Sequence, residues 1–84
     1  MSKKEKLLAG IRNNPKDVSF QDLDSLLRSA GFIRRQSSKG SSHYTYSHTR
    51  LVEILTVPKS KPVKAYIVKE ALRSYDLVME NNED

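Results

Sequence analysis

The spacing of apolar residues changes once along this 84-residue chain, from a helical period to a strand period. Between residues 20 and 30 apolar side chains recur at steps of three and four, which predicts a helix that ends before Gly31. Residues 41–48 instead alternate, with Tyr44 and Tyr46 on one side. This period of two predicts a strand with two unlike faces. The chain therefore has to combine helices with a sheet.

Helical spacing also occurs near both ends of the chain. It predicts a helix in residues 1–14 that stops before Pro15, and a closing helix after Pro62, where apolar residues recur about every four positions. Ser19 and Asp22 are placed to cap the start of the helix predicted between residues 20 and 30. The predicted strands cover residues 32–37, 42–48 and 51–57.

This order of elements predicts an α+β fold of two layers. Three antiparallel strands form the sheet, and helices pack on one of its faces, which leaves the other face open to a partner. We expect a single domain over residues 1–84, with its core in residues 18–78 and an acidic, frayed tail in residues 79–84.

Charge favours a polyanionic partner. The chain has 15 Lys and Arg against 10 Asp and Glu, a formal charge of +5. Between Asp24 and Glu53 it has no carboxylate. We expect this middle stretch to form a cationic face that binds nucleic acid. The candidate contacts to RNA, including residues just beyond the stretch, are Arg34, Arg35, Lys39, Gly40, Ser41, Ser42, Lys59 and Lys61.

Several other classes of function lack support in the sequence. There is no nucleotide-binding glycine motif and no cysteine, and the longest apolar run is far shorter than the roughly 20 residues of a membrane span. His43 and His48 are five residues apart, so on one strand they point to opposite faces and cannot share a metal. We therefore expect a cytoplasmic protein with no metal, cofactor or membrane partner.

One histidine lies in a basic, serine-rich hairpin. The imidazole of His43 can take a proton from a ribose 2′-hydroxyl or give one to a leaving 5′-oxygen, and RNA needs no metal for this route. Lys39 and the backbone N–H groups around Gly40 can hold the phosphate. These residues are sufficient for a minimal ribonuclease site. The same sequence is also compatible with a half-exposed strand histidine that has no chemical role.

A set of short motifs spans roughly residues 18 to 76: Gly31 and Phe32, Arg35 and Gln36, Lys39 to His43, Tyr46, Val57 and Pro58, and Ala71 to Arg73. In these positions the chain resembles the small HicA toxins of bacterial and archaeal toxin–antitoxin pairs. The resemblance implies a fold like that of the double-stranded-RNA-binding domain. It also implies a ribosome-independent mRNA interferase that cleaves with His43, preceded by the turn Gly40, Ser41 and Ser42, and is neutralised by a HicB-type antitoxin.

Some alternatives stay open at this point. These are a non-catalytic module that binds RNA through the same basic face, an antitoxin-like protein, and an adaptor for an acidic partner. Tyr44 and Tyr46 fit the core better than a stacking platform for bases, and His48 fits a turn. Arg34 and Arg35 alternate across a strand, so only one can share the outward face of the sheet.

Overall fold

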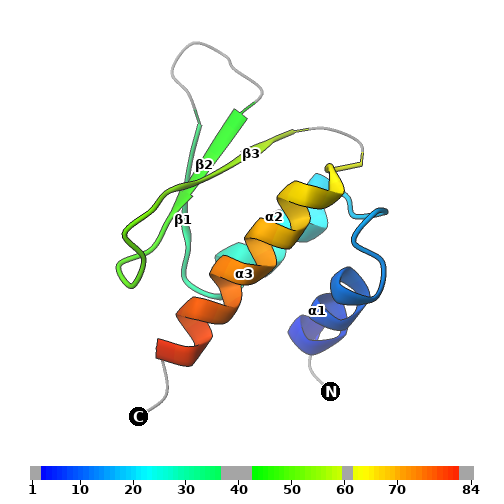
Figure 1. Cartoon of the computed structure of the whole chain (residues 1–84), viewed down its shortest axis with the longest axis horizontal. Coiled ribbons are helices and arrows are strands. Elements are labelled where there is room, and N and C mark those ends of the chain that lie inside the picture. Colours follow the sequence, from blue (N-terminus) through cyan, green and yellow to red (C-terminus); the bar gives the residue numbers. More distant parts are fainter. Residues whose placement is uncertain (1–2, 37–42, 60–61, 82–84) are drawn as a thin grey trace.

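The computed structural model describes residues 3–36, 43–59 and 62–81, which form three helices and one sheet. The α+β class and the three-stranded antiparallel sheet are confirmed (Figure 1). In chain order the elements are α1 (Lys3–Asn13), α2 (Phe20–Ser29), β1 (Ile33–Gln36), β2 (His43–Ser47), β3 (Leu55–Pro58) and α3 (Ala65–Asn81).

Helix α2 has a cap at each end, as its sequence predicts. Ser19 precedes the helix in extended backbone, and its Oγ accepts a hydrogen bond from the backbone N–H of Asp22 at 3.1 Å. After the helix, Gly31 has φ +96°, in the left-handed region that favours glycine. The N–H groups of Gly31 and Phe32 donate back to carbonyls of the last turn, which closes a Schellman motif and leads the chain into β1.

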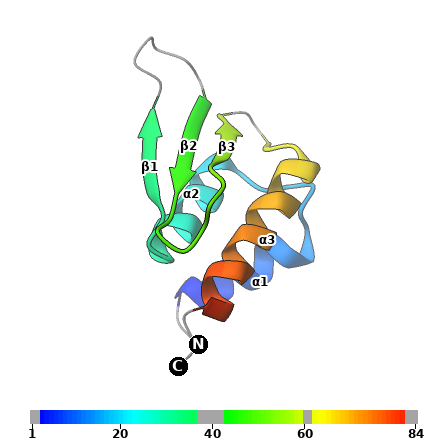
Figure 2. The same cartoon turned by 60° about the vertical axis from the view of Figure 1, so that its left-hand side comes forward.

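The strands pair as an antiparallel meander in the order β1-β2-β3. Arg34 is opposite Tyr46 across β1 and β2, and Tyr46 is opposite Leu55 across β2 and β3. Because strand side chains alternate, this register gives the sheet a face that includes Tyr46 and a face that includes His43. Figure 2 shows α2 and α3 on the same side of the sheet, with the other side uncovered.

The third strand is shorter than the sequence predicts. Aliphatic residues begin at residue 51, but β3 begins only at Leu55. Val52 and Ile54 precede it as exposed side chains of a loop. The physical reason is that β2 ends at Ser47, and the chain then turns. An aliphatic run forms a strand only where a neighbouring strand offers its backbone, and within the described residues none does so here.

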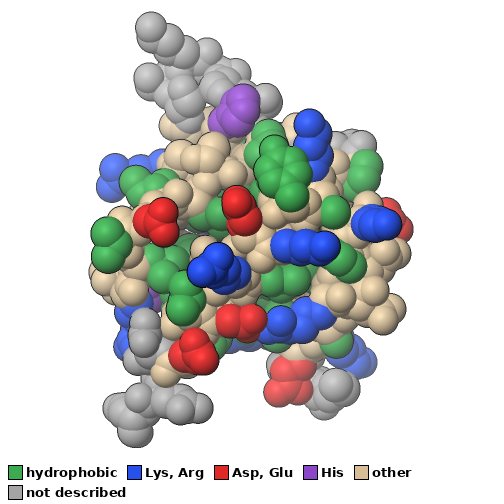
Figure 3. Space-filling view, viewed as in Figure 1, with side chains coloured by type: hydrophobic (Ala, Val, Ile, Leu, Met, Phe, Trp, Pro, Cys, Tyr) green, Lys and Arg blue, Asp and Glu red, His purple; other side chains and the backbone are tan. Residues whose placement is uncertain are grey.

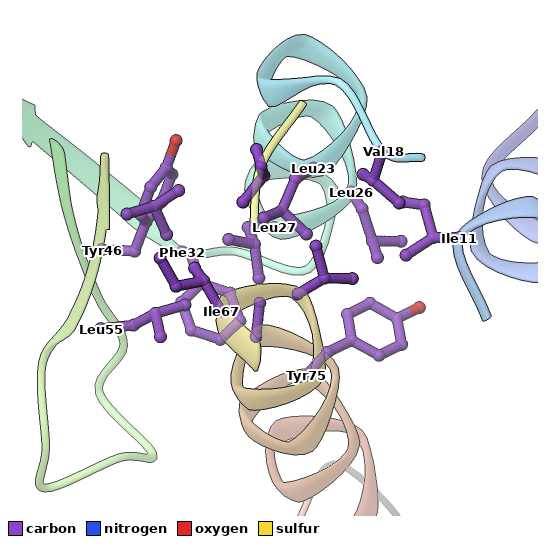
Figure 4. Close-up of a cluster of buried hydrophobic side chains, with 14 of the residues drawn as sticks. Ile11, Val18, Leu23, Leu26, Leu27, Phe32, Tyr46, Leu55, Ile67 and Tyr75 are labelled. Atoms are coloured by element: carbon purple, nitrogen blue, oxygen red, sulfur yellow. The ribbon is translucent and has the colours of Figure 1, made fainter. Parts of the chain in front are cut away.

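Apolar side chains from the sheet, α2 and α3 meet between the two layers (Figure 4). Leu23, Leu26 and Leu27 come from α2, and Tyr46 and Val57 come from the sheet; all five are at most 1% exposed. Helix α1 lies on the far side of this core from the strands and contributes Ile11 to it (Figure 4). The predicted arrangement of helices on one side of the sheet is therefore confirmed.

Helix α3 extends into the residues expected to form the tail, and an ion pair joins it to α1. It continues to Asn81, and Met79 packs on the core, while fraying of the tail stays a prediction. Arg12 of α1 forms an ion pair with Asp76 of α3. Such an exposed pair adds little stability, and most of the attachment of α1 comes from its buried apolar side chains.

Candidate nucleic-acid interface

His43 is the first residue of β2 and lies on the face of the sheet that the helices leave uncovered. It is exposed, and it pairs with Pro58 of β3. The next residue, Tyr44, points to the opposite side, where its ring centroid lies 5.0 Å from that of Phe20. The outward orientation expected for His43 is confirmed, and its catalytic role stays a prediction.

Arg35 shares the open face with His43. It is opposite Thr45, whose Oγ1 donates a hydrogen bond to the Arg35 carbonyl at 3.3 Å. Since Thr45 is two residues from His43 on β2, Arg35 and His43 are diagonal neighbours on one face. Such neighbours lie roughly 7–8 Å apart, within reach of a long side chain. A phosphate group can therefore contact a guanidinium and an imidazole here at once.

Arg34 lies on the opposite side of β1, which resolves the choice that the sequence left open. One guanidinium nitrogen is 3.3 Å from Oδ2 of Asp24, and the guanidinium carbon lies 5.2 Å from the centroid of the Tyr44 ring. Lys59 lines the same cavity as Arg34 and Tyr44, at the end of the sheet where β3 finishes. Of the predicted RNA contacts, the structure therefore brings Arg34 and Lys59 together and separates them from Arg35.

The basic residues of the middle stretch are thus divided between the two sides of the sheet, and the single cationic face that we expected is wrong for the described residues. On the helix side of the molecule, Lys and Arg side chains are interleaved with Asp and Glu (Figure 3). The remaining predicted contacts lie outside the described residues: Lys39, Gly40, Ser41, Ser42 and Lys61.

A buried carboxylate joins α2 to the sheet. Asp24 is 8% exposed, and its Oδ1 accepts a hydrogen bond of 2.7 Å from the Tyr46 hydroxyl. Its Oδ2 faces guanidinium groups of Arg34 at 3.3 Å and Arg28 at 3.8 Å. Burial of the phenol, together with its hydrogen bond to Asp24, raises the pKa of Tyr46 well above the usual tyrosine value. This network fixes the orientation of Arg34.

Sequence reasoning missed the role of Asp24. A signal for it exists, because Asp24 is four residues after Phe20 and three before Leu27, within the apolar stripe of α2. A carboxylate in such a stripe must find partners when it is buried. Both tyrosines of β2 face the helices as predicted; Tyr46 is buried and Tyr44 is half-buried.

His48 has a structural role at the turn after β2. Its Nε2 lies 3.2 Å from the Ala30 carbonyl, and its Nδ1 accepts a hydrogen bond from the Arg50 backbone N–H at 3.0 Å. These two contacts assign the tautomer with the proton on Nε2. The ring also packs edge-on against Phe32, with centroids 5.1 Å apart. The prediction of a turn residue is confirmed, and its contacts connect the turn to the end of α2.

The described part of the chain offers neither a metal site nor a membrane-spanning helix. In residues 3–36, 43–59 and 62–81, no group of three His, Asp or Glu side chains is placed to hold a metal ion. None of the helices described is both long enough and apolar enough to cross a membrane.

Comparison with known proteins gives no further guide to the site. No protein-family model, curated protein or solved structure matches the chain. The residues themselves carry the functional argument.

Proposed function

We propose that this protein is a metal-independent endoribonuclease of the HicA type, the toxin of a toxin–antitoxin pair, and that His43 is its general acid or base. The supporting observation is the exposed imidazole on the uncovered face of the sheet, diagonal to Arg35 on the neighbouring strand. Among the described residues, the helices cover the other face and leave this one open to a single-stranded RNA.

The reaction uses a nucleophile that the substrate carries. The ribose 2′-oxygen attacks the adjacent phosphorus, and the bond from phosphorus to the 5′-oxygen breaks. The products are a 2′,3′-cyclic phosphate and a free 5′-hydroxyl. His43 accepts the proton of the 2′-hydroxyl or supplies one to the leaving oxygen, a role for which an imidazole is suited near neutral pH. Arg35 binds the phosphate and offsets the negative charge that grows on it.

The arrangement of the elements agrees with the fold that this proposal requires. The order α2, β1, β2, β3 and α3, with both helices on one face of the sheet, supports a fold like that of the double-stranded-RNA-binding domain. The protein then acts on mRNA in the cytoplasm and is neutralised by a HicB-type antitoxin.

The test is cleavage of an end-labelled mRNA fragment in EDTA by the wild type, His43→Ala and His48→Gln. We expect His43→Ala to lower the cleavage rate at least about 100-fold, as for other general acid–base groups. We expect the product of the wild type to end in a cyclic phosphate. His48→Gln is the matched histidine control and keeps its activity below its melting temperature. Cleavage by His43→Ala at the wild-type rate would remove His43 from the mechanism.

Binding has to be measured beside cleavage, because a non-catalytic RNA-binding module is the alternative. We expect His43→Ala to bind the same RNA nearly as well as the wild type. Salt-sensitive binding by a wild type that cleaves no RNA in any buffer would favour the alternative.

A further inference from the structure

A cavity opens on the helix side of the sheet, at the end of the sheet near His43. Its volume is about 750 Å³, enough for a group the size of a nucleotide. Arg34 and Tyr44 form its wall on the sheet, Phe20 and Gln21 form its wall on α2, and Lys59 closes the end where β3 finishes. This cavity has no role in the proposed cleavage step.

The sheet wall of the cavity is a pair of planar groups, a guanidinium and a phenol ring. The guanidinium of Arg34 lies above the Tyr44 ring, 5.2 Å from its centroid, and Phe20 supports the same ring from α2 at 5.0 Å. Asp24 holds the guanidinium in place with a contact of 3.3 Å. Guanidinium and aromatic planes of this kind are the surfaces on which proteins stack unpaired bases.

Polar groups surround Arg34 and Tyr44. Lys59 supplies a cation for a phosphate, the Gln21 amide can both donate and accept hydrogen bonds, and the Asp17 carboxylate accepts them. A nucleobase offers a flat face together with N–H donors and carbonyl acceptors at its edge. The lining therefore suits a nucleotide better than a purely apolar or a purely anionic ligand.

Residues that line the cavity are direct sequence neighbours of residues on the proposed catalytic face. Arg34 and Arg35 are neighbours on β1, an edge strand whose residues are all exposed, and they point to opposite sides of it. Tyr44 likewise follows His43 on β2. An RNA strand that crosses this edge can place one phosphate near His43 and an adjacent base in the cavity.

We propose that this cavity is a subsite for one unpaired nucleobase of the RNA, with Arg34 and Tyr44 as the stacking surface and Lys59 as a phosphate contact. The proposal rests on the ribonuclease function for the identity of its ligand. Its test uses binding of mononucleotides, which does not depend on cleavage.

The experiment titrates the full chain with the 5′-monophosphates of adenosine, guanosine, cytidine and uridine, and follows backbone amide shifts by NMR. We expect saturable shifts at Gln21, Tyr44 and Lys59. Loss of the stacking ring in Tyr44→Leu weakens binding about tenfold, whereas Tyr44→Phe keeps the affinity. The matched control Tyr66→Leu changes a tyrosine that is 61% exposed on α3 and leaves binding unchanged.

Lys59→Gln gives a second variant that does not disturb packing, because Lys59 is exposed. We expect it to weaken mononucleotide binding about threefold, an effect that added salt removes, while the α3 control Lys69→Gln has no effect. Shifts that do not saturate would overturn the subsite. It would also be overturned if each cavity variant bound nucleotides as tightly as its α3 control, that is, Tyr44→Leu as tightly as Tyr66→Leu and Lys59→Gln as tightly as Lys69→Gln.

Cleavage kinetics separate failure of the subsite from failure of the ribonuclease proposal. If both proposals hold, Tyr44→Leu and Lys59→Gln raise KM for RNA, while His43→Ala lowers kcat. Saturable nucleotide binding by a wild type that cleaves no RNA supports the subsite and overturns the enzyme. His43-dependent cleavage with an unchanged KM in both cavity variants supports the enzyme and overturns the subsite.

Discussion

The two faces of the sheet use polar residues in different ways. On the helix side, buried Asp24 accepts a hydrogen bond from the Tyr46 hydroxyl and pairs with the exposed Arg34, and these contacts connect α2 to the strands. On the open side, His43 and Arg35 are exposed and contribute nothing to the apolar core. The comparison teaches that neighbours in sequence have different surroundings here: Arg34 is held by a carboxylate of the helix layer, whereas Arg35 is presented on the open face.

The largest effect on stability is expected at the centre of the helix-side network. Asp24→Ala leaves the Tyr46 hydroxyl without its acceptor and the Arg34 guanidinium without its counter-charge. We expect the free energy of unfolding to fall by about 3 kcal/mol, measured by urea denaturation. Glu70→Ala, on the exposed side of α3, should stay within about 0.5 kcal/mol of the wild type. A small loss in Asp24→Ala would show that the network is not a folding element.

Alkaline pH acts on the same network through Tyr46. Its pKa is raised in the folded state, so the folded phenol keeps its proton above pH 10, where the unfolded one ionises. The stabilising contribution is complete below about pH 10 and is lost above it, at up to about 1.4 kcal/mol per pH unit. Urea denaturation between pH 8 and 12 should therefore show a steeper decline for the wild type than for Tyr46→Phe. Parallel curves would contradict this.

The two histidines are expected to differ in how much they stabilise the fold, and these effects are of intermediate size. His48→Ala removes two hydrogen bonds and the packing on Phe32, and should lower the free energy of unfolding by about 1.5 kcal/mol. His43→Ala should change it by less than about 0.5 kcal/mol, because the side chain is exposed. Thermal melts of both variants provide the measurement. Equal losses would mean that His43 also serves the fold.

The smallest effect is expected at Arg35. Arg35→Gln removes one cation from the open face, so RNA binding should weaken about threefold and its dependence on log salt should decrease by about 0.7 for a single strand. Thermal stability should not change. Arg73→Gln on α3 has the same change in charge and should leave the salt dependence unaltered. Equal slopes for the two variants would place RNA away from the open face.

Local signals in the sequence were enough for the boundaries of α2 and for the orientation of β2. Ser19 and Gly31 meet backbone requirements at the ends of α2, and these depend on a few neighbouring residues only. Alternation along β2 likewise separates His43 from Tyr44 whatever the rest of the fold does. The candidate general acid or base was therefore within reach of sequence reasoning.

Other features depended on contacts between distant segments. The start of β3 depends on where β2 ends, and the side of the sheet on which Arg34 lies depends on the pairing of β1 with β2. The partner of Asp24 is also set by a distant segment, because Tyr46, 22 residues away in the sequence, donates a hydrogen bond to it. No local pattern contains these relationships.

By itself, the sequence determined the order of the elements, the caps of α2 and the outward orientation of His43, because each follows from steric and hydrogen-bonding preferences within a few residues. Only the tertiary structure decided that Arg34 and Lys59 face a cavity while Arg35 shares a face with His43. The physical reason is that strand register and layer packing, which assign each side chain to a face, are set by interactions between residues far apart in the chain.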